Sequence, residues 1–431
     1  MSGDFYFCFV MIQELFAYYL THPVVTTDSR NITPGCIFFA LKGEHFNGND
    51  FLQLALDQGA GRVVGDEEKG IQDKRCIICE DSLHALQTLA RMYRESWRFP
   101  VVGITGSNGK TTTKELVRDV LSTRYKVHAT KGNLNNHIGV PLTILSAPQN
   151  TELAIIEMGA NHQKEIASYC EYAQPTHGVI TNIGKAHLEG FGGQEGVKKG
   201  KKELYDYLSN HGGEIFVNLE LPWMQEITNG MSIIPFGQHF SIVVNDKPNG
   251  MDLLLDLGQE RIPFSSLLTG AYNVFNVQTA LEIGFHFGVD MKKAAQAVAD
   301  YLPENMRSQW KETEKNKLII DAYNANPTSL EHALIHLSKI TDDDTLAIVG
   351  EMREMGEYSA EEHGRMVELL TELGLAAILV GKEFEPWKMA FPYFETVDTL
   401  ISWIENNPLE RKTILIKGSR GIQLERVIPC L

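Results

Sequence analysis

The chain has no hydrophobic run long enough to cross a bilayer. Its longest apolar runs, such as 153–156 and 376–380, fall far short of the ~20 residues that a spanning helix needs. Cysteine is scarce, and among the six only Cys76 and Cys79 form a C-x-x-C, without a second pair. The first ten residues, MSGDFYFCFV, lack the basic start of a secretory signal. We therefore expect a cytoplasmic protein with reduced core thiols and no membrane span, with zinc or redox use of the C-x-x-C as the alternative.

Basic residues are also in deficit. The chain has 39 Lys and Arg against 55 Asp and Glu, a formal net charge of −16. Because a protein that neutralises nucleic-acid phosphates needs a basic surface, we expect no nucleic-acid partner. Any anionic substrate must then be held by local basic clusters. A content of 43% hydrophobic and 22% charged residues is typical of a globular protein.

The length and the order of apolar segments indicate three domains. A chain of 431 residues exceeds one ordinary core, and its length suggests about three. We expect domains over 1–97, 98–310 and 311–431. For the first, the patterns predict strands or helices over 35–41, 51–58, 61–65 and 82–95.

From residue 100 onward, strand and helix patterns alternate, which indicates a parallel sheet with helices on its faces. Elements of the second domain are predicted over 101–105, 114–121, 153–157, 163–172, 178–182 and 271–287, with shorter strands within 212–263. The alternation restarts with 318–322, 346–350, 376–381 and 413–417. The fold class is therefore α/β, with a central parallel-sheet domain and a Rossmann-like C-terminal domain.

Residues 103–111 read GITGSNGKT, between an apolar strand pattern and the helical pattern TTKELV. This order is the setting of a phosphate-binding loop. Gly106 and Gly109 let backbone N–H groups turn toward phosphate oxygens, Lys110 can reach the terminal phosphates, and the Thr111 hydroxyl can ligate Mg²⁺. A structural glycine turn is the alternative. The other nucleotide contacts expected of the loop are Ser107, Asn108 and Thr112.

Two further residues follow strands of the expected central sheet. Glu157 ends the apolar run LAIIE, and His187 follows GVITNIG by three residues. Both should lie at the carboxyl edge of the sheet, where ligands of open parallel sheets bind. Glu157 beside Thr111 can complete a Mg²⁺ site, with capping of the next helix as the alternative. His187 is a less usual Mg²⁺ ligand, and a hydrogen bond to its neighbours is the alternative.

Polar clusters elsewhere allow a functional and a structural interpretation. Asn273 and Asn276 share a helix face and can read an adenine edge, or Asn273 can cap the helix. The lysines within 198–202 form a charge run that is typical of a solvated face. The segments 321–327 (DAYNANP) and 417–420 (KGSR) each follow a strand, where parallel sheets present ligands or ordinary polar turns occur.

Seven segments together resemble the Mur ligase family in order and spacing: GITGSNGKTTTKE, KGNLNNHIGVPLT, IIEMGANHQKEI, TNIGKAHLEGFGG, GAYNVFN, DAYNANPTS and KGSR. Within that family, GNLNNHIGVP and YNANP look like the member that adds D-alanyl-D-alanine to UDP-N-acetylmuramoyl-tripeptide. The segment DSRNITPGCIFFALKGE is similar to its uridine-nucleotide domain. The resemblance implies that the peptide carboxylate attacks the γ-phosphate of ATP to give an acyl phosphate, which the dipeptide amine then attacks.

The resemblance also implies two Mg²⁺ ions. Thr111 and Glu157 would hold one, and Glu157 and His187 the other. Lys201 lies where the family has a lysine that reacts with CO₂, so that its carbamate supplies an oxygen ligand to the second ion. The other lysines of the run are the alternatives.

Further roles are carried over in the same way. Asn273 and Asn276 would face the adenine, Arg307 would contact the ATP phosphates across a domain junction, and Asp321 would bind the ribose. Ser29 and Arg30 resemble part of the uridine-nucleotide site. The remaining residues expected at the substrates are Asn133, Asn135, Asn136, Asn324, Asn326, Lys417, Ser419 and Arg420.

Some positions depart from the family pattern, namely Tyr272, Asn47, Asn49 and Glu351, so contacts to adenine and uridine should differ in detail. We expect a monomer whose partners are the UDP-tripeptide and D-alanyl-D-alanine, with diaminopimelate or lysine as the third peptide residue. Two alternatives remain. One is a folylpolyglutamate synthase-like ligase of the same mechanism, which the uridine-type N-terminal segment argues against. The other is a nucleotide switch without ligase activity.

Overall fold

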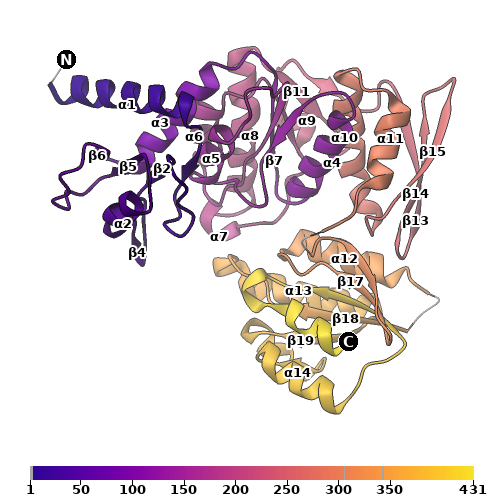
Figure 1. The fold of residues 1–431 in the computed structure, drawn as a ribbon. Helices are drawn as coiled ribbons and strands as arrows, with labels where there is room; N and C mark the ends of the chain where they lie inside the picture. Colours follow the sequence, from indigo (N-terminus) through magenta and orange to yellow (C-terminus); the bar gives the residue numbers. More distant parts are fainter. Residues whose placement is uncertain (1–2, 305, 342–343) are drawn as a thin grey trace.

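The computed structural model describes residues 3–304, 306–341 and 344–431 and consists of three α/β units in chain order (Figure 1). The expected α/β fold class with three domains is confirmed. Among the described helices, none combines the length and apolar character needed to cross a membrane. No disulfide joins the five cysteines whose side chains are described, and of these only Cys36 and Cys170 are fully buried.

The first unit is a four-stranded parallel sheet in the order β1-β2-β5-β6 with a small β3-β4 hairpin. Its elements are α1 (Gly3–Thr21), β1 (Val25–Thr26), β2 (Ile37–Phe39), β3 (Lys42–Gly43), β4 (Phe46–Asn47), η1 (Gly48–Phe51), α2 (Leu52–Asp57), β5 (Arg62–Gly65), β6 (Cys76–Ile78) and α3 (Ser82–Glu95). The helix α3 has the bounds that the sequence predicts. Its start is fixed by the Asp81 side chain, which caps the first turn.

Helices α1 and α3 also join this unit to the next one. The Tyr19 and Tyr93 hydroxyls donate to the backbone oxygens of Leu145 and Ala147, at 2.7 and 2.9 Å. The buried Arg94 donates to two carbonyls at the end of α6. The first unit therefore packs on the second through buried, hydrogen-bonded side chains.

The second unit is a six-stranded, all-parallel sheet in the order β12-β11-β10-β7-β9-β8. Its strands are β7 (Val101–Thr105), β8 (Val127–Ala129), β9 (Leu153–Glu157), β10 (His177–Ile180), β11 (Glu214–Val217) and β12 (Ile234–Pro235). Its helices are α4 (Lys110–Ser122), α5 (Gly139–Leu145), α6 (Glu165–Ala173), α7 (Leu188–Phe191), α8 (Gln194–His211), α9 (Met224–Ile227), η2 (Ala271–Asn273), α10 (Val274–His286) and α11 (Met291–Asp300). The predicted bounds of β7 and β9 are confirmed, whereas the predicted helix from 114 begins earlier, at Lys110.

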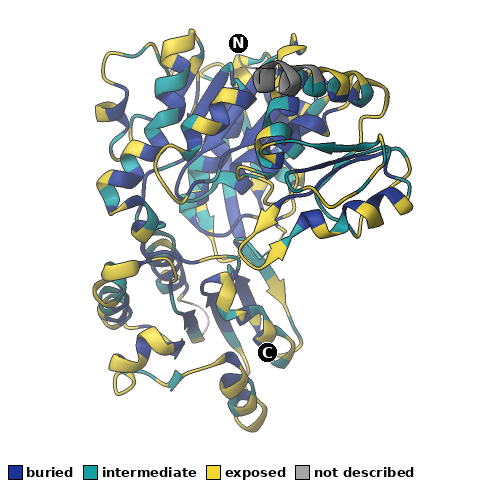
Figure 2. Ribbon diagram, turned by 90° about the vertical axis from the view of Figure 1, so that its left-hand side faces the viewer, coloured by how far each residue is buried: buried dark blue, intermediate teal, exposed yellow. Residues whose placement is uncertain are grey.

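Both faces of this sheet are covered, so its central strands are buried throughout (Figure 2). Val101 and Ile156 belong to one apolar cluster with α5, α6 and α8, while Val102 and Ile104 belong to another with α4 and α10. This alternation is the period-2 pattern of strands between two helical layers. A three-stranded antiparallel sheet, β13 (Ser241–Lys247), β14 (Gly250–Asp256) and β15 (Arg261–Ser266), extends the second cluster beyond α11.

The third unit has a six-stranded sheet in the order β16-β17-β21-β18-β19-β20, parallel except for β16. Its elements are β16 (Gln309–Glu312), β17 (Lys317–Ile320), α12 (Pro327–Ser338), β18 (Asp344–Gly350), η3 (Gly356–Tyr358), α13 (Ser359–Glu372), β19 (Ala376–Val380), η4 (Lys382–Trp387), β20 (Tyr393–Phe394), α14 (Val397–Asn406), β21 (Lys412–Lys417), η5 (Arg420–Ile422) and η6 (Leu424–Cys430). The unit lies below the carboxyl edge of the central sheet in Figure 1.

Candidate active site

A cavity of about 700 Å³ lies where the second and third units meet. The sheet order explains its position, because β10, β7 and β9 are neighbours and their carboxyl ends open toward the third unit. The predicted site residues that line it are Ser107, Asn108, Gly109, Lys110, Thr111, Thr112, Asn133, Asn135, Asn136, Glu157, His187, Asn273, Asn276, Arg307, Asp321, Asn324, Asn326 and Lys417. Segments far apart in the sequence thus converge as expected.

The phosphate loop is hydrogen-bonded to the two residues that follow β10. Asn108 receives a hydrogen bond to its backbone oxygen from Thr181 Oγ1 at 2.6 Å, and its N–H donates to Asn182 Oδ1 at 2.9 Å. A Cβ atom on Gly106 would lie 2.0 Å from Thr181 Oγ1, and both Gly106 and Gly109 have positive φ. The loop therefore requires these glycines. Thr181 and Asn182 were not predicted as site residues, although they belong to the segment TNIGKAHLEG.

Lys110 begins α4 at the floor of the cavity. Its ammonium donates to the backbone oxygens of Gly106 and Ser107 at 2.7 and 3.1 Å. Burial lowers the pKa of Lys110 to about 8, with the nearby charge of Glu157 acting in the opposite direction. A phosphate placed in the loop would favour the charged form of this amine.

Glu157 ends β9 and is fully buried beside the loop. Its Oε1 atom accepts hydrogen bonds from Thr111 Oγ1 at 3.0 Å and from Asn135 Nδ2 at 2.7 Å. Its Oε2 atom has no hydrogen-bond partner, and Lys114 Nζ lies 4.0 Å away. The alternative that Glu157 caps the next helix is wrong, because α6 begins after Lys164 without a side-chain cap. A buried carboxylate oxygen with no hydrogen-bond partner beside a threonine hydroxyl suits a hard divalent cation.

His187 also reaches the cavity, but its partner comes from the third unit. Its Nδ1 atom lies 2.5 Å from Glu354 Oε2, and this contact lowers the pKa of the Glu354 carboxyl. The backbone of Glu189 donates to that of Glu354 at 3.3 Å, and Lys185 pairs with Glu362. The loop that carries His187 is therefore part of the contact between the units. The sequence offered no reason to select Glu354.

Lys201 lies behind the cavity wall and not on its surface. Its side chain is 1% exposed, and Nζ donates to the backbone oxygen of Ala160 at 3.3 Å. Burial, together with the charge of Lys110, holds the pKa of Lys201 well below its ordinary value. The solvated-face interpretation is therefore wrong for Lys201. Of the alternatives, Lys199 is exposed and Lys202 is paired with Asp206.

The two asparagines of the GAYNVFN segment form one buried network. Asn276 donates to Asn273 Oδ1 at 2.7 Å and accepts from Thr113 Oγ1 at 3.0 Å. Asn273 donates to the Thr269 backbone oxygen and to Ser308 Oγ, at 2.8 and 3.1 Å. Its side chain makes no capping hydrogen bond, so that alternative is wrong. Both amides fix the base of α10 against the phosphate-loop helix.

Residues of the third unit form the wall of the cavity that faces the phosphate loop. Arg307 stacks 3.7 Å from the centre of the Tyr323 ring, and its buried Nε has no hydrogen-bond partner. Asp321 pairs with the buried Lys417 at 2.5 Å. Asn326 caps α12, whose first residue is Pro327, so the proline of YNANP begins this helix.

The side chains of Asn326 and Asn108 join the third unit directly to the phosphate loop. Asn326 Nδ2 donates to Asn108 Oδ1 at 2.7 Å, and Asn108 Nδ2 donates in return at 3.4 Å. The tip of the loop thus touches both units at once.

Several predicted residues lie outside the cavity lining. Arg30 is exposed and pairs with Asp28 in the first unit, next to Ser29. Ser419 accepts from the Arg353 backbone N–H at 2.9 Å, and Arg420 lies 5.2 Å from the Tyr323 ring. Gly106 and Lys201 support the lining from behind.

Comparison with known proteins accounts for this architecture. Residues 23–94 match the Mur ligase family catalytic domain, 104–284 the Mur ligase middle domain, and 306–420 the Mur ligase glutamate ligase domain. A UDP-N-acetylmuramoyl-tripeptide–D-alanyl-D-alanine ligase of Bacillus subtilis is 33% identical over 94% of this chain and 92% of its own length. The chain belongs to the Mur ligase family.

Solved members of the Mur ligase family have the same arrangement. A MurF structure from Acinetobacter baumannii superposes with a TM-score of 0.85 at 29% identity, covering 94% of this chain and 92% of that one. The MurF ligase of Thermotoga maritima, solved in complex with ADP, gives a TM-score of 0.84 at 26% identity, covering 95% and 97%.

Replacing Lys110 with alanine tests the phosphate loop of this Mur ligase family member. We expect affinity for ATP to fall about 10- to 100-fold, because a charge-assisted hydrogen bond is worth roughly 1.5–3 kcal/mol. Isothermal titration calorimetry with a non-hydrolysable ATP analogue measures this. Lys126→Ala, which removes an exposed lysine of the same unit, should bind like the parent protein. Equal affinities for the two variants would contradict the assignment of the loop.

Proposed function

We propose that the chain is an ATP-dependent ligase that joins D-alanyl-D-alanine to UDP-N-acetylmuramoyl-tripeptide, in the synthesis of peptidoglycan precursors. The observation that carries this proposal is the likeness to named ligases of that reaction along 94–96% of the chain. The cavity supports it, since the phosphate loop, a buried carboxylate and a second unit meet there. The domains proposed for the three parts are 1–97, 98–310 and 311–431.

The reaction must overcome the poor reactivity of a carboxylate toward an amine. A carboxylate oxygen of the tripeptide forms a bond to the γ-phosphorus of ATP, and the bond from that phosphorus to the bridging oxygen breaks, with the electron pair leaving on ADP. The amine nitrogen of D-alanyl-D-alanine then attacks the acyl carbon. The carbon–oxygen bond to phosphate breaks, phosphate leaves, and the nitrogen loses its proton. Positioning and charge stabilisation supply most of the acceleration.

Lys110 and Arg307 are proposed to bind the phosphates from opposite sides. Lys110 presents its ammonium at the mouth of the loop, and Arg307 has a buried N–H without a partner at the facing wall. A phosphoryl group between them would gain charge-assisted hydrogen bonds from both units. We propose that Asp321 binds the ribose and that Asn273 and Asn276 face the adenine, which requires their present hydrogen bonds to rearrange.

Thr111, Glu157 and His187 are the residues proposed to hold two Mg²⁺ ions. The fit rests on Glu157, whose Oε2 atom is buried without a hydrogen-bond partner beside the Thr111 hydroxyl. Mg²⁺ bound there would neutralise charge on the phosphoryl group in transfer. In the present arrangement His187 is paired with Glu354, so a metal at His187 must compete with that carboxylate.

Lys201 is proposed to react with CO₂ to form a carbamate. The amine nitrogen attacks the carbon of CO₂ and loses a proton, which converts a neutral amine into an anionic oxygen ligand. Its burial favours the neutral amine, the form that reacts. The carbamate would lie behind Ala160, which lines the cavity.

The remaining substrate contacts are proposed for the cavity walls and the first unit. Ser29 and Arg30 would contact the uridine nucleotide on the first unit. The tripeptide and the dipeptide would contact Asn133, Asn135, Asn136, Asn324, Asn326, Lys417, Ser419 and Arg420. Because one chain carries every proposed residue, we propose that the protein acts as a monomer. We also propose that it works in the cytoplasm and has no nucleic-acid partner.

The proposed function is tested by asking which substrates ATP turnover requires. We expect phosphate release only when ATP, Mg²⁺, the UDP-tripeptide and D-alanyl-D-alanine are all present. Mass spectrometry should then find a product heavier than the UDP-tripeptide by the dipeptide minus water. Turnover without the UDP-tripeptide would favour a nucleotide switch, and turnover with folate and glutamate would favour a folylpolyglutamate synthase.

Replacing Lys201 with alanine tests the carbamate. We expect a fall in kcat of at least about 100-fold, because an anionic ligand of the catalytic centre is lost. Acetate or formate should restore part of the rate by occupying the vacated space. Lys202→Ala serves as the control and should retain its rate. The carbamate is excluded if Lys201→Ala keeps the parent rate in bicarbonate-free buffer.

A further inference from the structure

Two histidines and a glutamate meet at the edge of the central sheet opposite the cavity. His177 and Glu214 are the first residues of β10 and β11, and His286 is the last residue of α10. His177 Nε2 lies 3.6 Å from Glu214 Oε1, and His286 Nε2 lies 3.4 Å from Glu214 Oε2. The three ligand atoms lie within 4.8 Å of one another.

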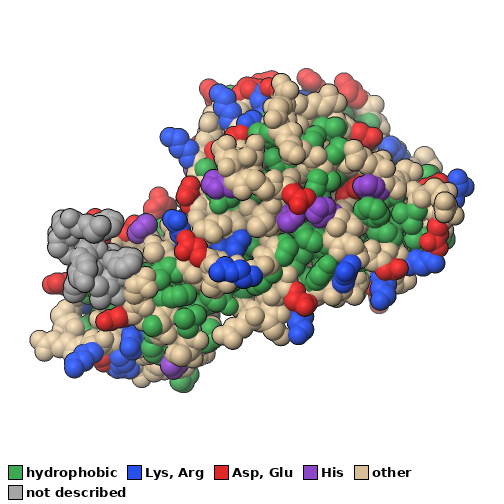
Figure 3. Space-filling view, turned by 90° about the horizontal axis from the view of Figure 1, so that it is seen from above, with side chains coloured by type: hydrophobic (Ala, Val, Ile, Leu, Met, Phe, Trp, Pro, Cys, Tyr) green, Lys and Arg blue, Asp and Glu red, His purple; other side chains and the backbone are tan. Residues whose placement is uncertain are grey.

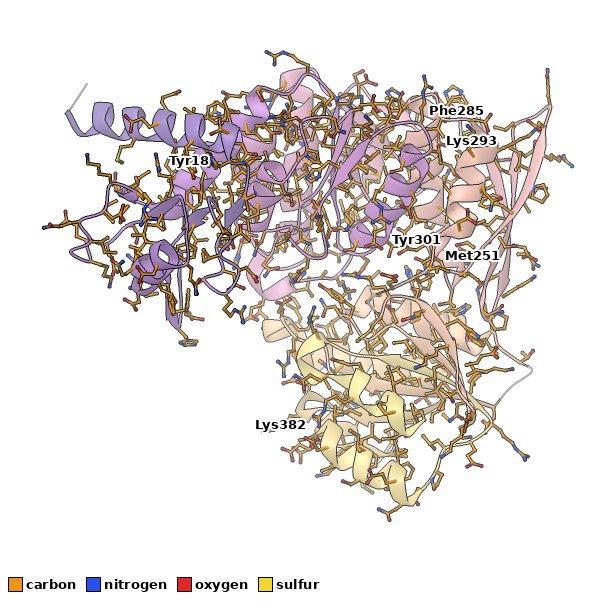
Figure 4. All side chains as sticks on the ribbon, in the orientation of Figure 1. Tyr18, Met251, Phe285, Lys293, Tyr301 and Lys382 are labelled. Atoms are coloured by element: carbon orange, nitrogen blue, oxygen red, sulfur yellow. The ribbon has the colours of Figure 1, made fainter. Side chains whose placement is uncertain are left out.

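This cluster is well separated from the phosphate loop. Strands β7, β9 and β10 carry the cavity residues at their carboxyl ends, whereas His177 and Glu214 stand at amino-terminal ends. Figure 3 looks on to this face, where histidine and acidic side chains lie close together near its centre. Phe285, the residue before His286, is labelled at the upper end of α10 in Figure 4, far from the third unit.

The orientation of His177 is fixed by its other ring nitrogen. Nδ1 lies 2.8 Å from Thr176 Oγ1, and that hydroxyl donates to the Val101 backbone oxygen at 3.2 Å. The tautomer with its hydrogen on Nδ1 would donate to Thr176 Oγ1 and leave a lone pair on Nε2, on the side of Glu214. Metal-binding histidines are held in this manner by a partner on the second nitrogen.

His177 makes no hydrogen bond to Glu214 within the cluster. Its side chain is 8% exposed, and its Nε2 faces Glu214 Oε1 at 3.6 Å, beyond hydrogen-bond distance. A cation between the two atoms would satisfy both.

We propose that His177, Glu214 and His286 bind one divalent transition-metal ion of the Zn²⁺ type. A tetrahedral Zn²⁺ with ligands at about 2.0–2.1 Å needs ligand atoms roughly 3.3–3.4 Å apart. The two histidine nitrogens lie 3.6 and 3.4 Å from the two different oxygens of Glu214, and one ligand atom from each residue lies within 4.8 Å of the others. Small side-chain movements of the exposed His286 and Glu214 would bring the three atoms to this spacing. Imidazole nitrogens with one carboxylate favour Zn²⁺ over Mg²⁺. The side chains of His286 and Glu214 are 28% and 49% exposed, so water can fill the fourth position.

The ion would link the far end of α10 to the beginnings of β10 and β11. The near end of α10 carries Asn273 and Asn276 at the cavity. Because the ligands come from three elements of the folded chain, the unfolded chain would bind the ion more weakly. Zn²⁺ should therefore raise the thermal midpoint of unfolding. The site takes no part in the ligase reaction and does not depend on it.

Zn²⁺ binding is measured by equilibrium dialysis of the full chain against ZnCl₂. Excess Mg²⁺ and ADP are present throughout, so that the phosphate loop and its carboxylate are occupied. We expect one tightly bound Zn²⁺ per chain and a rise in the thermal midpoint. Absence of any bound Zn²⁺ would overturn the proposal.

His286→Ala is the main variant, because it removes an exposed ligand and should fold. We expect at least about tenfold weaker Zn²⁺ binding and loss of the thermal shift, with ATP turnover kept. Glu214→Gln should weaken binding likewise. His84→Ala removes an exposed histidine on α3 and should bind Zn²⁺ as the parent does. Equal Zn²⁺ affinity for the parent, His286→Ala and Glu214→Gln would overturn the proposal.

Discussion

The carboxylate of Glu157 lies fully buried, with one oxygen held by Thr111 and Asn135 and the other without a hydrogen-bond partner. Leaving a charged oxygen in this state costs free energy unless a cation or proton joins it. Lys114 Nζ lies 4.0 Å from that oxygen, beyond hydrogen-bond distance. The neighbouring loop offers backbone amides and Lys110 for phosphate, so the proposed magnesium–nucleotide complex would supply both a cation at the carboxylate and an anion at the loop. The other residues of the cavity surround this carboxylate and the phosphate loop.

The lining of that cavity depends on how the second and third units are placed relative to each other. Asn108 at the tip of the loop exchanges hydrogen bonds with Asn326, and His187 is paired with Glu354. A movement of the third unit would therefore change the surroundings of both the phosphates and a proposed metal ligand. Domain closure on substrates is a common way to complete such a site and to exclude water. The first unit is joined to the second through the hydrogen bonds of Tyr19 and Tyr93.

The sequence was sufficient where local pattern decides the structure. Buried parallel strands appear in the sequence as continuous apolar runs, and this pattern placed Glu157 at the end of β9. The glycine-rich loop was recognised because it lies between such a run and a helical pattern. The sequence was insufficient where packing across units decides, as for Glu354, which lies 167 positions after its partner His187 in the chain numbering. Lys201 could have been singled out, because Val197 and Leu204 mark the buried face of the same helix. The hydrogen bonds of Asn273 could not be read from spacing, since they depend on Ser308.

The central claim is that a carboxylate becomes a mixed anhydride with phosphate before the amide forms. Its most direct test uses UDP-tripeptide labelled with ¹⁸O in the reacting carboxyl group, together with unlabelled ATP and dipeptide. One ¹⁸O atom should pass from the peptide acid into the phosphate released in each turnover, as seen by mass spectrometry of that phosphate. Phosphate free of ¹⁸O, alongside normal product formation, would contradict the claim.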